Sequence, residues 1–161
     1  MVDFPSGRGA GDASDMSAVL AALSEQVACY RLLARLAERQ HEHVLNDHTE
    51  GLLEVLKERE AVLDRAAALE RTVGPVKREW ASVSVRLPAE TRRAFETLLA
   101  ETRSLLAEIT AGDERDALAM QQRKLRIGEE LRATAAAKKV HRSYAAGAYA
   151  RAVPPELDAQ T

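Results

Sequence analysis

Apolar side chains recur at alternating spacings of three and four residues along the first third of this 161-residue chain. The row between Ser17 and Leu45 contains Leu20, Leu23, Val27, Tyr30, Ala34, Ala37, His41 and Val44. This spacing forms the seam of an α-helix that packs lengthwise on another helix. At ~1.5 Å per residue such a helix is more than ~40 Å long. The pattern therefore restricts the chain to folds built from long, laterally packed helices.

The apolar composition favours the same fold class. Ala and Leu together supply 50 residues, whereas Ile supplies two and the aromatic residues make up 4% of the chain. Strands are built mainly from β-branched and aromatic residues, and Ala and Leu favour helices. An all-β or parallel α/β fold is therefore not expected.

Residues that end or start helices predict where each helix lies. Asn46-Asp47 and Gly112-Asp113 each place a residue that tolerates left-handed geometry before an acidic cap, and Gly74-Pro75 is a helix stop. The expected helices span residues 17–45, 47–73, 76–86, 89–111 and 113–149. We expect an all-α fold in which long antiparallel helical hairpins form an elongated four-helix, coiled-coil-like bundle over residues 17–151. Residues 1–16 and 152–161 are expected to be a flexible lead-in and tail.

The residues that could carry catalysis or bind a metal do not form a known constellation. Glu38 and His41 make one Glu-x-x-His pair, but a di-iron bundle site needs a second pair, which the sequence lacks. His41 is instead interpreted as a polar interruption of the seam that helps to set its register. Cys29 lies beside the seam, as an inert buried thiol would. We expect no enzyme activity, no metal and no cofactor. No apolar run approaches the ~20 residues that span a bilayer, so we expect a cytoplasmic protein.

Two segments of the chain carry opposite net charge. Residues 38–70 contain nine acidic and four basic residues, whereas residues 121–151 contain eight basic and two acidic residues. These segments either balance one another in the fold, or the basic helix contacts an acidic partner or nucleic acid. The basic residues alternate with Ala and lack aromatic stacking platforms, so nucleic acid is not the expected partner.

The last predicted helix has a broken apolar stripe that is typical of a face left partly open. The residues expected to bind a partner are Leu118, Arg123, Leu125, Arg126, Leu131, Tyr144 and Tyr149. The stretch from Ser143 to Tyr149 is rich in small residues. It fits either a fraying helix end or an adaptable docking surface.

The segment from Leu32 to Glu70, with its break at Asn46-Asp47, resembles the FlgN-type flagellar export chaperones. Members of that family have a Leu- and Glu-rich helix, a short break and a helix of the type Leu-x-x-Leu-x-x-Lys-x-x-Leu. Here Leu53, Leu56, Lys57 and Leu63 occupy comparable places. Residues 91–144 are also similar, although Gln121-Gln122 stands where many members carry asparagines.

The resemblance implies a cytoplasmic chaperone that binds helical segments near the C-termini of hook-associated junction subunits and keeps these subunits soluble before secretion. A helix-in-groove mode of binding would suit this role. Two alternatives are a structural coiled-coil protein that self-associates and, behind it, a nucleic-acid binder that uses its basic helix.

Overall fold

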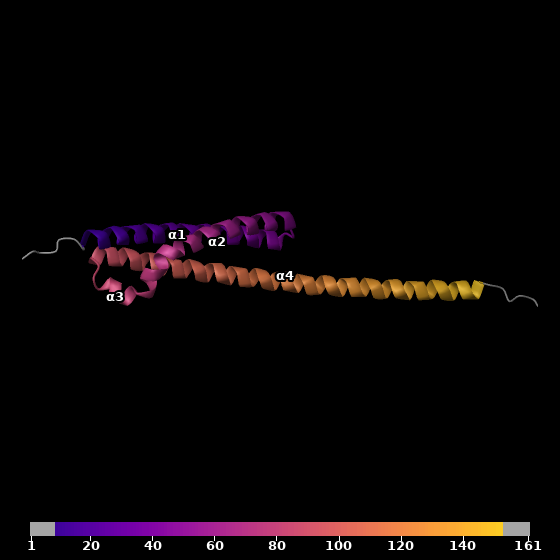
Figure 1. The fold of residues 1–161 in the computed structure, drawn as a ribbon. Helices are drawn as coiled ribbons and strands as arrows, with labels where there is room; N and C mark the ends of the chain where they lie inside the picture. The colour runs from indigo at the N-terminus through magenta and orange to yellow at the C-terminus, as the bar shows by residue number, and fades with distance from the viewer. Residues whose placement is uncertain (1–8, 153–161) are drawn as a thin grey trace, which may run out of the picture. The chain divides into compact units, whose positions relative to one another are not determined.

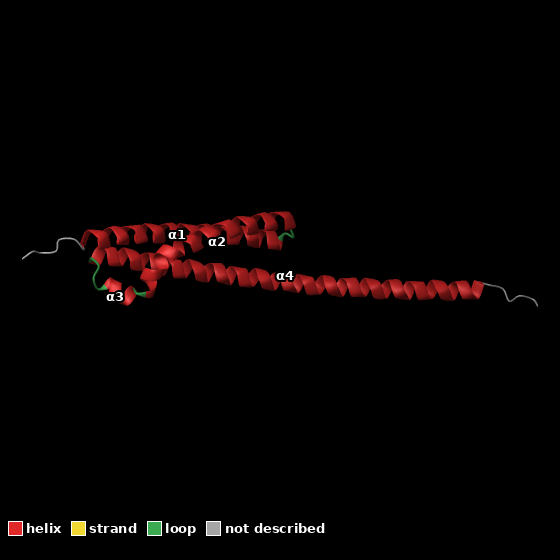
Figure 2. Ribbon diagram, viewed as in Figure 1, coloured by secondary structure: helices red, strands yellow, loops and turns green. Residues whose placement is uncertain are grey.

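A computed structural model describes residues 9–152 of the chain, with side chains described from residue 15 to residue 148. Helices in this range are α1 (Gly9–Leu45), α2 (Thr49–Arg78), α3 (Trp80–Ser84) and α4 (Ala89–Ala152) (Figure 1). No strand occurs between residues 9 and 152 (Figure 2). The predicted all-α fold class is therefore confirmed.

The chain divides into two units, the first ending at Ala117 and the second beginning at Leu118. The described part of the first unit contains α1, α2, α3 and the part of α4 that precedes residue 118. The described part of the second unit is the remainder of α4, residues 118–152.

The first unit has its core where α1, α2 and α4 meet. Val19, Leu23, Val73 and Phe95 form a buried cluster. From α3, Trp80 stacks on the ring of Phe95, with ring centroids 4.3 Å apart. Phe95 and Leu23 are completely buried, which places the predicted seams of the first and third helices in the core.

Side-chain pairs between the helices give the topology of this unit. Arg31 of α1 pairs with Glu101 of α4, and Gln40 of α1 bonds to Asp116 of α4. Residue numbers therefore increase in the same direction along the two helices. Between α1 and α2 they run in opposite directions, because Gln26 bonds to Glu70 whereas Gln40 bonds to Arg59. Within the first unit, α1 and α4 are therefore parallel and α2 is antiparallel to both.

The turn between α1 and α2 lies where the sequence predicted it, but its residues have other roles than expected. Asp47 adopts the left-handed conformation, with φ of 56°. An N-cap residue has extended backbone geometry, so Asp47 is not the N-cap of α2. The N-cap is His48, whose side chain makes no capping hydrogen bond. The predicted cap at Asp47 is therefore wrong.

Gly74-Pro75 does not stop α2, which continues to Arg78. Pro75 lacks only its own N–H, and its carbonyl accepts a hydrogen bond from the Glu79 N–H at 3.2 Å, so the last turn still closes. The helix expected over residues 76–86 is reduced to the five residues of α3.

Gly112-Asp113 does not break the chain either, and the helices expected at 89–111 and 113–149 are a single helix, α4. The predicted second hairpin is therefore not formed. The sequence predicted a bundle of four long helices. In the described part of the first unit, α1 packs instead with α2 and with the part of α4 that precedes residue 118. The polar cluster described below explains why α4 continues through Gly112.

The predicted ends of the helical region also need correction. Residues 9–16 belong to α1, so this helix begins before the predicted residue 17, and Met16 packs against the core cluster. Residues 1–8 and 153–161, the rest of the predicted lead-in and tail, lie outside the described residues, and Ala152 is the last residue of α4.

Candidate functional site

A cluster of polar side chains lies between α1, α2 and α4 in the first unit. Arg59 donates hydrogen bonds to both carboxylate oxygens of Asp113, at 2.6 and 2.7 Å, and to Gln40 Oε1 at 2.5 Å. Gln40 Nε2 donates to Asp116 Oδ2 at 2.8 Å, and His41 Nδ1 lies 2.6 Å from Asp116 Oδ1. Asp116 is only 2% exposed. The cluster therefore joins α1, α2 and α4 at one level.

These contacts give the cluster a structural role. The carboxylates of Asp113 and Asp116, which follow Gly112 in α4, accept hydrogen bonds from α1 and α2 and hold this part of α4 against the two helices. Buried polar networks of this kind fix the register of packed helices. The interpretation of His41 as a polar interruption of the seam fits this arrangement. Sequence reasoning assigned Asp113 and Asp116 to a helix start, although both continue the three-four spacing of Ile109.

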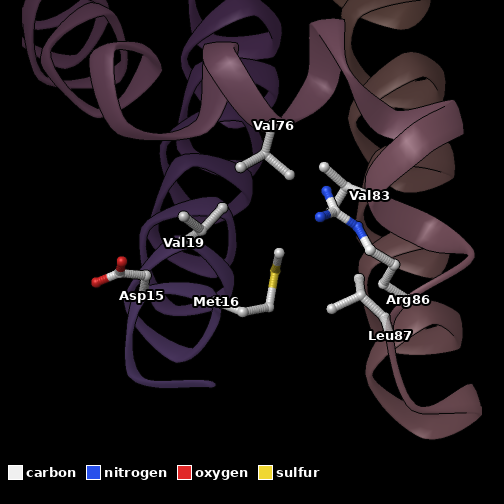
Figure 3. Close-up of a pocket in the computed structure, with 7 residues that line it drawn as sticks. All are labelled: Asp15, Met16, Val19, Val76, Val83, Arg86 and Leu87. Carbon is white, nitrogen blue, oxygen red and sulfur yellow. The ribbon is translucent and has the colours of Figure 1, made fainter. Parts of the chain in front are cut away.

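A cavity of about 230 Å³ lies at the end of the first unit where α1 begins (Figure 3). Its lining consists of Asp15, Met16, Val19, Val76, Val83, Arg86 and Leu87. Figure 3 shows Met16 and Val76 facing the interior, with the guanidinium of Arg86 along one wall. The walls are mainly aliphatic, so the cavity suits an apolar group and offers no array of polar groups for catalysis.

Large apolar side chains are exposed along the second unit. They are Leu118, Met120, Leu125, Ile127, Leu131, Val140 and Tyr144, with exposed fractions between 44% and 77%. Exposed apolar side chains that gather in one region are typical of protein interaction sites. This segment is therefore the candidate functional site.

The exposed apolar residues of the second unit form two faces. At about 100° per residue, Met120, Ile127 and Leu131 lie within about 40° of one another, in register with the buried Ile109 and Asp116 of the same helix. We call them the seam face, because they continue the seam of α4.

The second group lies on the other side of the helix. Its members are Leu118, Leu125, Val140 and Tyr144, which fall within about 100° of one another and which we call the outer face. All four are more than half exposed.

The partner-binding residues predicted from the sequence do not form a single surface. Those on or beside the outer face are Leu118, Leu125, Arg126 and Tyr144, whereas Arg123 and Leu131 lie on or beside the seam face. Tyr149 lies in α4, and its side chain is outside the described part. The sequence prediction omitted Met120 and Ile127 from the site. The three-four spacing that starts at Phe95 would have revealed them if α4 had been expected to continue.

The second unit is strongly basic. Between residues 118 and 148 it carries seven basic residues and two acidic ones, Glu129 and Glu130. In the described residues 131–148 every side chain is exposed, so these charges lie at the surface. A surface of this sign favours partners that carry acidic side chains.

Glu70 is a titratable side chain that links α1 to the end of α2. Burial raises the pKa of its carboxyl, but hydrogen bonds from Lys77 and Gln26, both at 2.8 Å, and the positive charges of Lys77 and Arg78 outweigh burial. The pKa of Glu70 therefore lies below its ordinary value of 4.5. Nearby, burial and the Glu70 charge raise the pKa of Tyr30.

No group of three or more His, Cys, Asp or Glu residues between residues 9 and 152 could hold a metal ion. Within the same range no helix is both long and apolar enough to cross a bilayer. Cys29 is a buried free thiol, as the sequence predicted.

Comparison with protein-family models, with curated proteins and with solved structures finds no match to this chain. The function proposed below therefore rests on the residue pattern and on the surfaces of the two units.

Proposed function

We propose that the protein is a cytoplasmic export chaperone of the flagellar type, which binds helical segments of hook-associated junction subunits before their secretion. The outer face of the second unit supports this proposal most directly. Its four large apolar side chains are more than half exposed on one side of a helix. The pattern from Leu32 to Glu70, which resembles the FlgN-type chaperones, supplies the choice of client.

The outer face has the chemistry of a surface that receives an amphipathic helix. Leu118 and Leu125 are about two turns apart and offer apolar anchors, and Val140 and Tyr144, about one turn apart, offer a second pair farther along. Ala133 lies between the two pairs and allows close approach of a backbone. Charged groups at the edge of such a surface act mainly on the association rate.

The basic residues beside the outer face define the client further. Arg126 and Arg132 flank its apolar anchors. A client helix with an apolar stripe and acidic flanks would bury leucines and pair these charges. Such a helix would associate faster at low salt.

The test is a binding titration with the C-terminal helical segments of the organism's own junction subunits. The variant Leu125→Ser with Val140→Ser should weaken binding by about 10- to 100-fold, because two apolar contacts are lost. The matched control is Ile127→Ser on the seam face, which should bind as the parent does. Thermal unfolding should be unchanged in both, since all three side chains lie at the surface.

Three results would contradict the proposal. The first is that no junction subunit binds the parent protein. The second is that Ile127→Ser weakens binding as much as the double variant does. The third is that the double variant unfolds the protein, which would place the outer face in a core.

The seam face favours a second candidate function, that of a self-associating helical protein. Met120, Ile127 and Leu131 continue a stripe that is buried earlier in the same helix, yet they are exposed. A partner that covers them would complete the stripe. The two candidates use different faces, so variants can separate them.

A further inference from the structure

The turn that follows α3 presents three side chains to the cavity at the beginning of α1. They are Val83, Arg86 and Leu87. The Arg86 N–H donates to the Val83 carbonyl at 3.1 Å, and the next N–H along the chain donates to the Ser84 carbonyl at 3.3 Å. The chain therefore keeps a tight turn after α3 ends. Side chains three and four residues apart lie on one side of such a turn, so the three form one wall of the cavity.

The rest of the lining is mainly apolar and comes from the two long helices. Met16 and Val19 belong to α1, and Val76 belongs to α2 (Figure 3). The volume of about 230 Å³ is about half as large again as that of an apolar cavity which binds benzene. On this comparison it has room for an apolar chain of about six to nine carbon atoms.

Arg86 brings a positive charge to this apolar space. Its Nε donates to the Ser82 carbonyl at 3.3 Å, which fixes one edge of the guanidinium. With the residues that the structure describes, its Nη1 and Nη2 groups make no hydrogen bond or ion pair. Figure 3 shows these groups pointing into the cavity, whereas the carboxylate of Asp15 points away from it. A carboxylate is the acceptor whose geometry fits a guanidinium.

We propose that this cavity binds a medium-chain carboxylate, with the hydrocarbon chain between α1 and α3 and the carboxylate on Arg86. Burial of the chain removes apolar surface from water on both sides of the contact. The cavity belongs to the first unit and the outer face to the second, so this site is independent of the proposed client.

Isothermal titration calorimetry of the full chain tests the proposal, with butanoate, hexanoate, octanoate, decanoate and dodecanoate as the probes. From butanoate to octanoate, each two added carbons should tighten binding by about 10-fold, because they bury further apolar surface. The gain should end at dodecanoate, whose chain exceeds the room in the cavity. Octanoate should also raise the melting temperature, since it binds the folded chain.

The charge of Arg86 is tested by comparing octanoate with 1-octanol, a neutral probe of the same chain length. Arg86→Gln should weaken octanoate binding by about 5-fold, because the lost ion pair lies at an exposed edge, and should leave 1-octanol binding unchanged. The matched control is Arg93→Gln. This arginine is exposed and does not line the cavity, so the variant should bind octanoate as the parent does.

The volume of the cavity is tested by filling it. Val83→Phe and Val76→Phe place a ring in the cavity from different walls, and each should abolish octanoate binding. The control is Val85→Phe, at a position that is 75% exposed and outside the lining, and it should bind octanoate normally. Thermal unfolding of each variant identifies those that fold as the parent does, and the comparison is made among these.

The proposal is overturned if octanoate does not bind, if affinity keeps rising through dodecanoate, or if Val85→Phe loses binding as the filling variants do. Unchanged octanoate binding in Arg86→Gln would assign the cavity to a neutral apolar group, such as a side chain of a partner, and would also contradict the carboxylate. Leu125→Ser with Val140→Ser should bind octanoate as the parent does. A parent that binds its client but not octanoate would therefore refute only the present inference.

Discussion

Arg59 and Asp116 occupy helix positions that a continuous apolar seam would fill with leucine or valine. Both are at least nine-tenths buried, and both make hydrogen bonds to residues of another helix. A buried ion pair adds little net stability compared with apolar residues, but removal of one partner is costly. These residues therefore fix the axial register in which α4 packs against α1 and α2.

Arg59→Met tests this role, because it removes the donor to Gln40 Oε1 and both guanidinium hydrogen bonds to Asp113. We expect the free energy of unfolding to fall by about 2 kcal/mol in denaturant titrations. The control is Arg65→Met, which removes an exposed ion pair with Glu25 and should cost less than ~1 kcal/mol. Equal losses in the two variants would show that the cluster does not join the helices.

Glu70 predicts how stability depends on pH. Its pKa is lowered in the folded chain, so its contribution is present above the unfolded pKa and is lost as pH falls through the folded pKa. We expect the melting temperature of the parent to fall as pH drops below about 4.5, partly through this residue. Glu70→Gln should show a smaller fall over the same range. Parallel curves for parent and variant would exclude Glu70 as a source of the acid sensitivity.

At the scale of helices, packing overrules the local signals that end a helix. Gly112-Asp113 is a good turn sequence, yet α4 passes through it because Asp113 and Asp116 bind side chains of α1 and α2. Pro75 lies inside α2 although it cannot donate a hydrogen bond to the carbonyl of Arg71, and the preceding Val73 and Gly74 are buried. The apolar spacing predicted the buried faces of the helices, since burial depends on the spacing itself. The helix ends depend on contacts with residues that are distant in the sequence, and the local sequence does not reveal these contacts.

Gly112→Ala tests whether α4 is continuous. A Cβ at this position would meet only Arg115 Nη2, at 3.9 Å, and Ala favours a helix over Gly by about 0.5–1 kcal/mol. We expect the variant to be more stable by that amount in denaturant titrations. The contrasting change is Gly51→Ala, whose Cβ would crowd the rings of His43 and His48, and it should destabilise. A loss of stability in Gly112→Ala would indicate a left-handed turn at this residue.

At the scale of the whole molecule, the sequence predicted a helical fold and exposed apolar residues after Leu118, but not the faces they form. A break at Gly112 resets the helical register in the prediction. Met120 and Ile127 were therefore not recognised as a continuation of the seam that contains Ile109. Leu125 and Leu131 were assigned to one surface although they lie about 120° apart both on the predicted helix over residues 113–149 and on α4. The polar cluster was missed for the same reason, because Asp113 was given the role of a cap.

The central claim is that residues 15–117 form a packed core whereas residues 118–148 form a helix with open apolar faces. Hydrogen exchange followed by mass spectrometry tests it most directly, with the protein diluted until it sediments as a monomer. Amides of residues 95–116 should exchange only when the whole unit unfolds. Amides of residues 118–148 should exchange far faster, through local opening of the helix. Equal protection of the two segments in the monomer would contradict the claim, because it would show that residues 118–148 belong to the core.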